Sequence, residues 1–202
     1  RLLDEAEAKR LLAAAGIAVP RHVAAADLSA LGPLAAALTP PLALKGLGFA
    51  HKSEAGAVRL GLASLAGEAP MPGANGYLAE EMVAGGVAEV LLGLRRDPVY
   101  GVTLTLGMGG TAAELLGDTQ TLVLPVTGDE ILAALRRLRL WPLLDGHRGR
   151  ARADVPALVA MAERLCARML ADAALEEIEI NPVILRGDGA VAVDALIRKG
   201  GD

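Results

Sequence analysis

Near its end the sequence reads Glu176-Glu-Ile-Glu-Ile-Asn-Pro-Val-Ile-Leu-Arg-Gly-Asp-Gly-Ala-Val-Ala-Val-Asp-Ala-Leu-Ile197. The Gly187-Asp188 turn separates two stretches rich in β-formers, which predicts antiparallel strands over 176–185 and 190–197. A two-residue loop pairs residues whose numbers sum to 375, so Asn181 lies opposite Asp194, with their Cβ atoms about 5 Å apart. The closing hairpin therefore brings an amide oxygen and a carboxylate together.

The same hairpin carries a third oxygen donor. Strand alternation places Glu179 on the face of Asn181 and Asp194. The opposite, apolar face is expected to carry Ile178, Ile180, Val191 and Val193. Oxygen donors suit a hard cation such as Mg²⁺, which takes one or two carboxylates from a protein and completes its shell with water and phosphate oxygens. The pattern therefore predicts a metal site, although it also fits a solvated hairpin face.

The rest of the chain mixes short helices with antiparallel strands. Helices are expected over 4–15, 29–38, 128–140 and 155–171. Further strands are expected over 41–45, 57–62, 77–83, 87–96, 99–106 and 121–126. Pro, Gly and Asn residues between 66 and 76 indicate a linker or an exposed loop. The fold class is therefore α+β, with a smaller N-terminal lobe over 1–76 and a larger C-terminal lobe over 77–202.

Composition narrows the class of protein. Of 202 residues, 53% are hydrophobic, and the longest apolar runs are far shorter than the roughly 18 residues that span a bilayer. A formal net charge of −4, with one Trp, two Tyr and one Phe, argues against a nucleic-acid surface. The charged start and the single cysteine, Cys166, predict a cytoplasmic protein without an intrachain disulfide. Because no initiator Met is present, we expect partner domains outside the sequence.

Lys45 and His51 lie in a segment suited to phosphate. Lys45 ends an apolar strand directly before the glycine loop of residues 46–56, and a second strand follows the loop. The Lys45 ammonium is placed to reach a nucleotide phosphate, and an imidazole at His51 can take a phosphoryl group on nitrogen. Each residue alone also fits a simpler interpretation, a surface lysine at a strand end and an exposed loop histidine.

Glu80 and Glu81 end a strand where the two lobes are expected to join. A carboxylate at that position suits the hydroxyl groups of a ribose, and the backbone that follows suits an adenine. The alternative is a charged strand edge that only keeps the sheet from aggregating.

Together these segments resemble the ATP-grasp domain of NDP-forming acyl-CoA synthetases, the β part of ADP-forming acetate-CoA ligases. They are more distantly similar to the β subunit of succinyl-CoA synthetase. The likeness covers nearly the whole chain. It is carried by Leu44-Lys45, His51-Lys-Ser-Glu-Ala-Gly-Ala-Val-Arg-Leu-Gly61, Leu78-Ala-Glu-Glu-Met82, Gly86-Val-Ala-Glu-Val-Leu-Leu-Gly-Leu-Arg-Arg-Asp97, Gly109-Gly110 with Glu114, Trp141-Pro-Leu-Leu-Asp-Gly-His-Arg-Gly149, Glu179-Ile-Asn-Pro182 and Ala192-Val-Asp194.

The resemblance implies an ATP-grasp fold in which two lobes hold ATP or ADP with Mg²⁺ between them. The nucleotide-binding residues it implies are Lys45, Glu81, Met82, Val83, Glu89, Gly109, Gly110 and Glu114. Asn181 and Asp194, with Glu179, match the metal ligands, and His51 matches the histidine phosphorylated on this domain. Two departures from the family pattern are a short Pro/Gly stretch over 62–76 in place of a helix, and Leu122 where many members carry arginine.

The resemblance also implies partners and a function. The CoA-binding domain and the second phosphohistidine of the family lie in another segment or subunit, and the acyl phosphate is reached through the histidine relay. The expected function is phosphoryl transfer between nucleotide and histidine as part of an ADP-forming acyl-CoA ligase. Two other classes stay open: a ligand-sensing domain of an acetyltransferase-fused regulator, and a structural subunit that binds no nucleotide.

Overall fold

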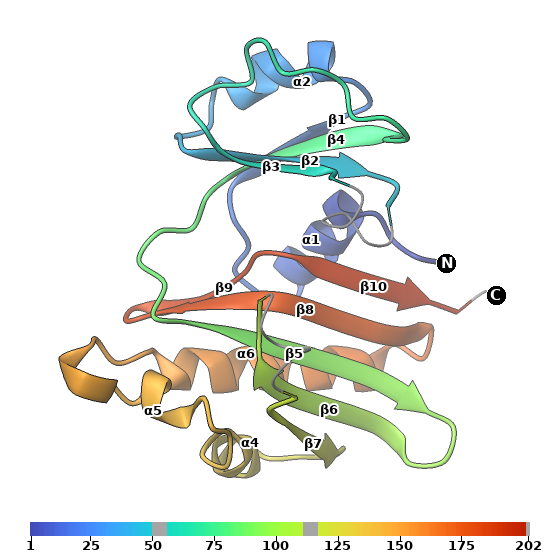
Figure 1. Ribbon diagram of the computed structural model, residues 1–202. Coiled ribbons are helices and arrows are strands. Elements are labelled where there is room, and N and C mark those ends of the chain that lie inside the picture. The colour runs from blue at the N-terminus through green and yellow to red at the C-terminus, as the bar shows by residue number, and fades with distance from the viewer. Residues whose placement is uncertain (50–55, 111–116, 201–202) are drawn as a thin grey trace. The chain divides into compact units, whose positions relative to one another are not determined.

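The computed structural model describes residues 1–49, 56–110 and 117–200 (Figure 1). The chain divides into two compact units. The smaller unit comprises Asp4–Glu7 and Pro20–Ala84, and the larger unit comprises Arg1–Leu3, Ala8–Val19 and Gly85–Asp202. Helix α1 (Glu5–Ala14) contributes its first residues to the smaller unit and the rest to the larger one.

The smaller unit is built on a four-stranded antiparallel sheet in the order β1-β4-β2-β3. Its strands are β1 (His22–Ala25), β2 (Leu42–Leu47), β3 (Val58–Leu62) and β4 (Gly76–Glu81), and β1 was not expected from the sequence. Helix α2 (Leu28–Ala35) begins at Asp27, whose carboxylate accepts the Ala30 N–H at 2.8 Å. Residues 63–75 form turns and no helix.

The boundary between the units lies after Ala84, whereas the sequence suggested a boundary after residue 76. The reason is the pairing of β4, which lies between β1 and β2 and is buried along nearly its whole length. The Pro/Gly-rich stretch before β4 is therefore a loop inside the smaller unit.

The larger unit contains a six-stranded sheet in the order β10-β8-β5-β6-β7, with β9 paired to β8. Its strands are β5 (Ala88–Asp97), β6 (Gly101–Met108), β7 (Thr119–Val123), β8 (Leu175–Arg186), β9 (Gly189–Ala192) and β10 (Ala195–Lys199). Its helices are α4 (Gly128–Leu135), α5 (Trp141–Leu144), the short 3-10 helix η1 (His147–Gly149) and α6 (Val155–Ala171). Within the part that the structure describes, no helix is long and apolar enough to cross a bilayer.

Capping explains where two of these helices begin. Thr127 and Glu130 form a capping box at the start of α4, as their spacing predicts. The helix ends at Leu135, five residues earlier than expected, and turns lead from there to α5. Helix α6 has the bounds that the sequence predicts, because Asp154 caps it and Pro156 stands in its first turn.

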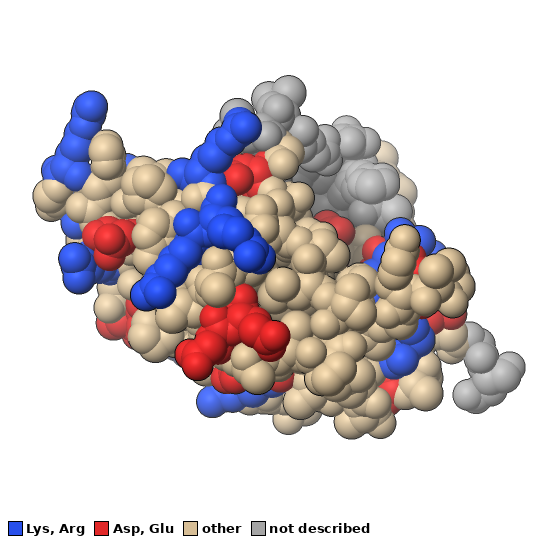
Figure 2. All heavy atoms as spheres, turned by 90° about the horizontal axis from the view of Figure 1, so that it is seen from below, with Lys and Arg blue, Asp and Glu red and all other residues tan. Residues whose placement is uncertain are grey.

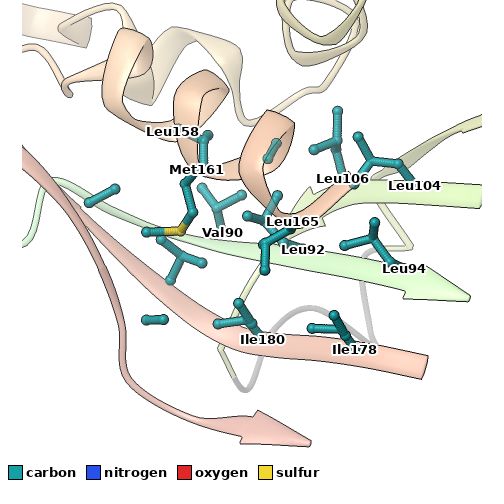
Figure 3. Close-up of a cluster of buried hydrophobic side chains, with 14 of the residues drawn as sticks. Val90, Leu92, Leu94, Leu104, Leu106, Leu158, Met161, Leu165, Ile178 and Ile180 are labelled. Carbon is teal, nitrogen blue, oxygen red and sulfur yellow. The ribbon is translucent and has the colours of Figure 1, made fainter. Parts of the chain in front are cut away.

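The core of the larger unit lies between its sheet and α6 (Figure 3). The strands contribute Val90, Leu92, Leu94, Leu104, Leu106, Ile178 and Ile180, and the helix contributes Leu158, Met161 and Leu165. Burying one such side chain stabilises the fold by about 1.5–3 kcal/mol. Because side chains alternate along a strand, the intervening residues point to the other face of the sheet.

The closing hairpin has the predicted register. Val183 pairs with Ala192 and Ile180 pairs with Ala195, so both pairs keep the sum of 375. The Asn181 N–H donates to the Asp194 carbonyl at 3.1 Å. The expected strand over 190–197 is interrupted at residues 193–194, which separate β9 from β10.

The prediction that Val191 and Val193 lie on the apolar face of the hairpin is wrong. Ala190 and Ala192 are buried there, and Val191 is only half-buried. The register between β5 and β8 shifts between Val90 and Leu92, which pair with Val183 and Ile180. Strand β8 thus holds one extra residue at Asn181-Pro182, and an extra residue reverses the alternation beyond it.

Candidate functional site

On the larger unit, the turn after β6 lies against β5 and β8. The Gly109 N–H donates to the Glu89 carbonyl at 2.9 Å, and the Gly110 N–H donates to Asn181 Oδ1 at 2.8 Å. Asn181 in turn is bonded to Asp194 through the backbone. The structure therefore brings together five of the residues predicted for the nucleotide and metal site.

Both glycines are needed for this close approach. A Cβ atom at Gly109 would lie 2.7 Å from the carbonyl carbon of Val90, and a Cβ at Gly110 would collide with Glu89 Oε2. Gly110 also has φ +73°, a conformation that glycine adopts without strain. The lack of a side chain at Gly109 and the positive φ of Gly110 let the backbone N–H of residue 110 reach Asn181.

The oxygen donors of the hairpin fit a Mg²⁺ ion. Asn181 and Asp194 are half-buried and opposite each other, and Glu179 is exposed two residues before Asn181. The side-chain oxygen of Asn181, Oδ1, has two lone pairs, of which the Gly110 N–H takes one. Among the described residues, no three His, Cys, Asp or Glu side chains form a metal-binding group. A site with few protein oxygens matches Mg²⁺, which keeps several positions for water and phosphate.

Small and polar residues cross the sheet from Glu179, on the face opposite the core. Gly93 pairs with both Glu179 and Thr105, and Thr105 pairs with Thr121. The two threonine hydroxyl groups are 3.0 Å apart. This polar strip begins at Glu179, one of the predicted metal ligands, and the sequence interpretation did not single it out.

In the smaller unit, Lys45 lies in a buried cluster of charges. Its Nζ is 2.6 Å from Glu5 Oε1 and 2.8 Å from Glu80 Oε1, and all three side chains are at most 5% exposed. Glu5 was not among the site residues predicted from the sequence. It stands on α1 three residues before Ala8 and seven before Leu12, so a charged residue inside an apolar stripe was the available signal.

The residues predicted for the adenine and ribose lie at the end of β4. Glu81 Oε1 accepts hydrogen bonds from Arg21 Nη1 and from the Thr39 N–H, both at 2.9 Å. Met82 is exposed, its N–H donates to the Pro41 carbonyl, and Val83 is half-buried. These contacts fix the backbone after β4. His51 and Glu114, also predicted for the site, lie outside the described residues.

Cys166 is a structural residue of α6. Burial raises the pKa of its thiol to about 11, and the nearby carboxylate of Glu163 acts in the same direction. Since the thiolate is the nucleophilic form, little of it exists near neutral pH. A buried thiol with a raised pKa is poorly suited to act as a nucleophile.

A separate groove of about 690 Å³ lies on the larger unit beside α4, α5 and α6. Its wall includes Trp141, with the Arg136 guanidinium 5.7 Å from the ring centre, and the charges of Asp129, Arg152 and Glu163. None of the predicted site residues that the structure describes lines this groove. On the face of the chain shown in Figure 2, basic and acidic side chains lie next to each other, so that face has mixed charge.

Comparisons with known proteins agree with this fold. The ATP-grasp domain family matches residues 1–198. The chain is 30% identical to the β subunit of ADP-forming acetate-CoA ligase I of Pyrococcus furiosus, over 96% of this chain and 90% of that subunit. It is 29% identical to ADP-forming acetate-CoA ligase I of Archaeoglobus fulgidus over 94% of this chain, but it spans only 30% of that longer protein.

Solved structures show the same architecture. A dinucleotide forming acetyl-coenzyme A synthetase 1 of Ca. Korarchaeum cryptofilum, in complex with coenzyme A, Ca-AMPCP and HgCl⁺, superposes with a TM-score of 0.89. The match covers 99% of this chain and 94% of that chain at 27% identity. A second structure of that protein, with a TM-score of 0.84, contains coenzyme A and Mg-AMPPCP, and its phosphohistidine segment points towards the nucleotide binding site.

The match to the family and the superposition confirm the ATP-grasp fold that the sequence motifs predict. The similarity extends over both units, because the family match begins at residue 1 and ends at residue 198. The chain therefore belongs to the ATP-grasp domain family and is similar, along nearly its whole length, to the β subunit of an ADP-forming acetate-CoA ligase.

Proposed function

We propose that this chain is the nucleotide-binding module of an ADP-forming acyl-CoA synthetase, which transfers a phosphoryl group between ATP or ADP and His51. The observation that carries the proposal is the convergence of Asn181, Asp194 and the Gly109-Gly110 turn beside β8, where β5 begins and β6 ends. The relatives described above are ligases and synthetases, which favours this function over a ligand-sensing regulator.

Asn181 and Asp194 are the proposed ligands of Mg²⁺, with Glu179 beside them. When bound, Mg²⁺ neutralises the charge that develops on the phosphate oxygens. The half-buried position of Asn181 and Asp194 and the hydrogen bond from Gly110 hold the ligand oxygens in place before nucleotide binds. Positioning and electrostatic stabilisation of this kind account for most of the rate enhancement in enzymatic phosphoryl transfer.

Lys45 is the proposed phosphate ligand of the smaller unit. Its ammonium has three N–H donors, and Glu5 and Glu80 fix its position on β2. Glu81, Met82 and Val83 are proposed for the ribose and adenine, and Glu89 and Glu114 for the nucleotide. The contacts of Glu81 with Arg21 and Thr39 orient that carboxylate.

The phosphoryl step is a displacement at phosphorus. An imidazole nitrogen of His51 attacks the γ-phosphorus of ATP, the bond from that phosphorus to the bridging oxygen breaks, and ADP leaves. The imidazole proton passes to solvent. In the reverse direction phosphohistidine gives its phosphoryl group to ADP.

The acyl-CoA chemistry requires a partner. The chain spans 30% of the Archaeoglobus relative and 90% of the separate Pyrococcus β subunit, so a CoA-binding domain or subunit of the same enzyme is the proposed partner. The acyl phosphate then reaches this chain only through the histidine relay. The chain alone is not expected to form acyl-CoA.

Labelling with γ-³²P-ATP and Mg²⁺ tests the phosphoryl step. We expect an acid-labile, base-stable label on the parent chain and on a His147→Asn control, whose histidine is exposed on η1. His51→Asn is expected to abolish the label. A label that persists in His51→Asn, or a parent chain that takes up none, contradicts the proposed function.

A further inference from the structure

A fully buried lysine of the larger unit contacts the segment that carries Asp194. Lys9 lies on α1 with its side chain 0% exposed, and its Nζ donates to the Val193 carbonyl at 2.7 Å. Lysine is almost never fully buried unless it is paired. An apolar residue would fill the same volume without desolvating a charge. Core packing alone therefore does not account for a lysine at this position.

The Val193 carbonyl that Lys9 contacts lies in an irregular part of the hairpin. Val193 and Asp194 occupy the break between β9 and β10. Opposite residues in an antiparallel pair can exchange two backbone hydrogen bonds. The Val193 N–H donates to the Pro182 carbonyl at 3.1 Å, but Pro182 has no N–H to return to Val193. Lys9 provides the Val193 carbonyl with a donor from α1 instead.

Other contacts hold the neighbouring atoms of the same segment. The Ala192 N–H donates to the Ala18 carbonyl at 2.9 Å, just beyond α1, and the Asp194 carbonyl accepts from Asn181. Lys9 thus holds the carbonyl of the peptide that links Val193 to Asp194, and the backbone groups on either side of that peptide are bonded to β8. Its orientation sets the direction in which the Asp194 side chain leaves the backbone.

We propose that Lys9 is a positioning residue of the metal site, which orients the Asp194 carboxylate toward the ion that it shares with Asn181. This inference rests on the proposed function, because that function places Mg²⁺ at Asp194. Residues that orient metal ligands from outside the coordination shell typically change metal affinity by about 10–100-fold when they are replaced.

The test is Lys9→Met in the full chain, because methionine keeps much of the apolar stem and removes the ammonium. Mn²⁺ serves as the probe, titrated by electron paramagnetic resonance in the presence of saturating ADP. We expect Lys9→Met to weaken Mn²⁺ binding by about 10–100-fold and to leave ADP binding in EDTA unchanged. Lys9→Arg, which keeps a charged donor, is expected to restore Mn²⁺ affinity toward that of the parent.

Leu12→Ala is the matched control. Leu12 is fully buried one turn later on α1, so its truncation loosens the same core without removing the Lys9 hydrogen bond. If Leu12→Ala and Lys9→Met weaken Mn²⁺ binding equally, or if Lys9→Met leaves it unchanged, Lys9 is only a structural residue.

Failure of the proposed function and failure of the Lys9 variant to fold can each be recognised. A parent chain that binds no Mn²⁺ with ADP overturns the proposed function, and this inference with it, before any variant is compared. If Lys9→Met does not fold, Lys9→Gln takes its place, since glutamine is polar but too short to hold the Val193 carbonyl. The same two outcomes then decide the role of Lys9.

Discussion

Replacing Lys45 with methionine is expected to lower the free energy of unfolding by about 3–5 kcal/mol, because it leaves buried carboxylates without their ammonium partner. Lys45 is bonded to both Glu5 and Glu80, and the three side chains are almost completely removed from water. Urea unfolding followed by circular dichroism measures the loss. Adding Glu5→Gln and Glu80→Gln to Lys45→Met is expected to recover part of it, because the stranded charges are then gone.

Arg21→Met is the control for this prediction. Arg21 pairs with Glu81, the residue after Glu80 on the same strand, but its side chain is 64% exposed. Exposed pairs contribute less than about 1 kcal/mol. A Lys45→Met chain that unfolds at the same urea concentration as Arg21→Met would show that the buried cluster does not stabilise the smaller unit. Binding experiments on Lys45 variants therefore require a matched measurement of stability.

Gly109→Ala is expected to lower the free energy of unfolding by about 1–3 kcal/mol, because the added methyl group meets backbone atoms that cannot rotate away. The nearest of these are the carbonyl carbon, nitrogen and oxygen of Val90, at 2.7–2.9 Å. The shift that relieves the clash also moves the Gly110 N–H away from Asn181. Thermal unfolding reports the first effect, and the chemical shift of the Asn181 side-chain amide reports the second.

Gly93→Ala provides the comparison. Gly93 lies on the same strand as Val90, and a Cβ there would make only an ordinary contact with Thr105 at 3.8 Å. Glycine inside a strand weakens it, so Gly93→Ala is not expected to lower stability. Equal unfolding temperatures for the two variants would show that the turn after β6 accommodates a methyl group at residue 109. That result would contradict the claim that this position requires glycine.

The sequence predicted the closing hairpin well because local chemistry determines it. The short turn at Gly187-Asp188 sets the register, and that register places Asn181 opposite Asp194. The faces beyond Asn181 could not be predicted in the same way. The extra residue of β8 is visible only against β5, a strand about 90 positions earlier in the chain.

The site itself needed more than local pattern. The bond between Gly110 and Asn181 joins residues 71 positions apart, and only the resemblance to a known family placed both at one site. Glu5 and Lys9 were not predicted, because the sequence indicated only that residues 4–15 form a helix. Their positions in its apolar stripe carried the signal, since a charge at a core position requires a partner.

Calorimetric titration of Mg-ATP into the parent chain, Asp194→Asn and Asp188→Asn tests nucleotide and metal binding most directly. Both variants lose one negative charge, but Asp188 lies at the exposed hairpin turn, paired with Arg186. We expect saturable binding by the parent and by Asp188→Asn, and an affinity at least about tenfold weaker for Asp194→Asn. Absence of binding by the parent at millimolar Mg-ATP, or equal affinities for all three chains, would contradict a magnesium-nucleotide site at Asn181 and Asp194.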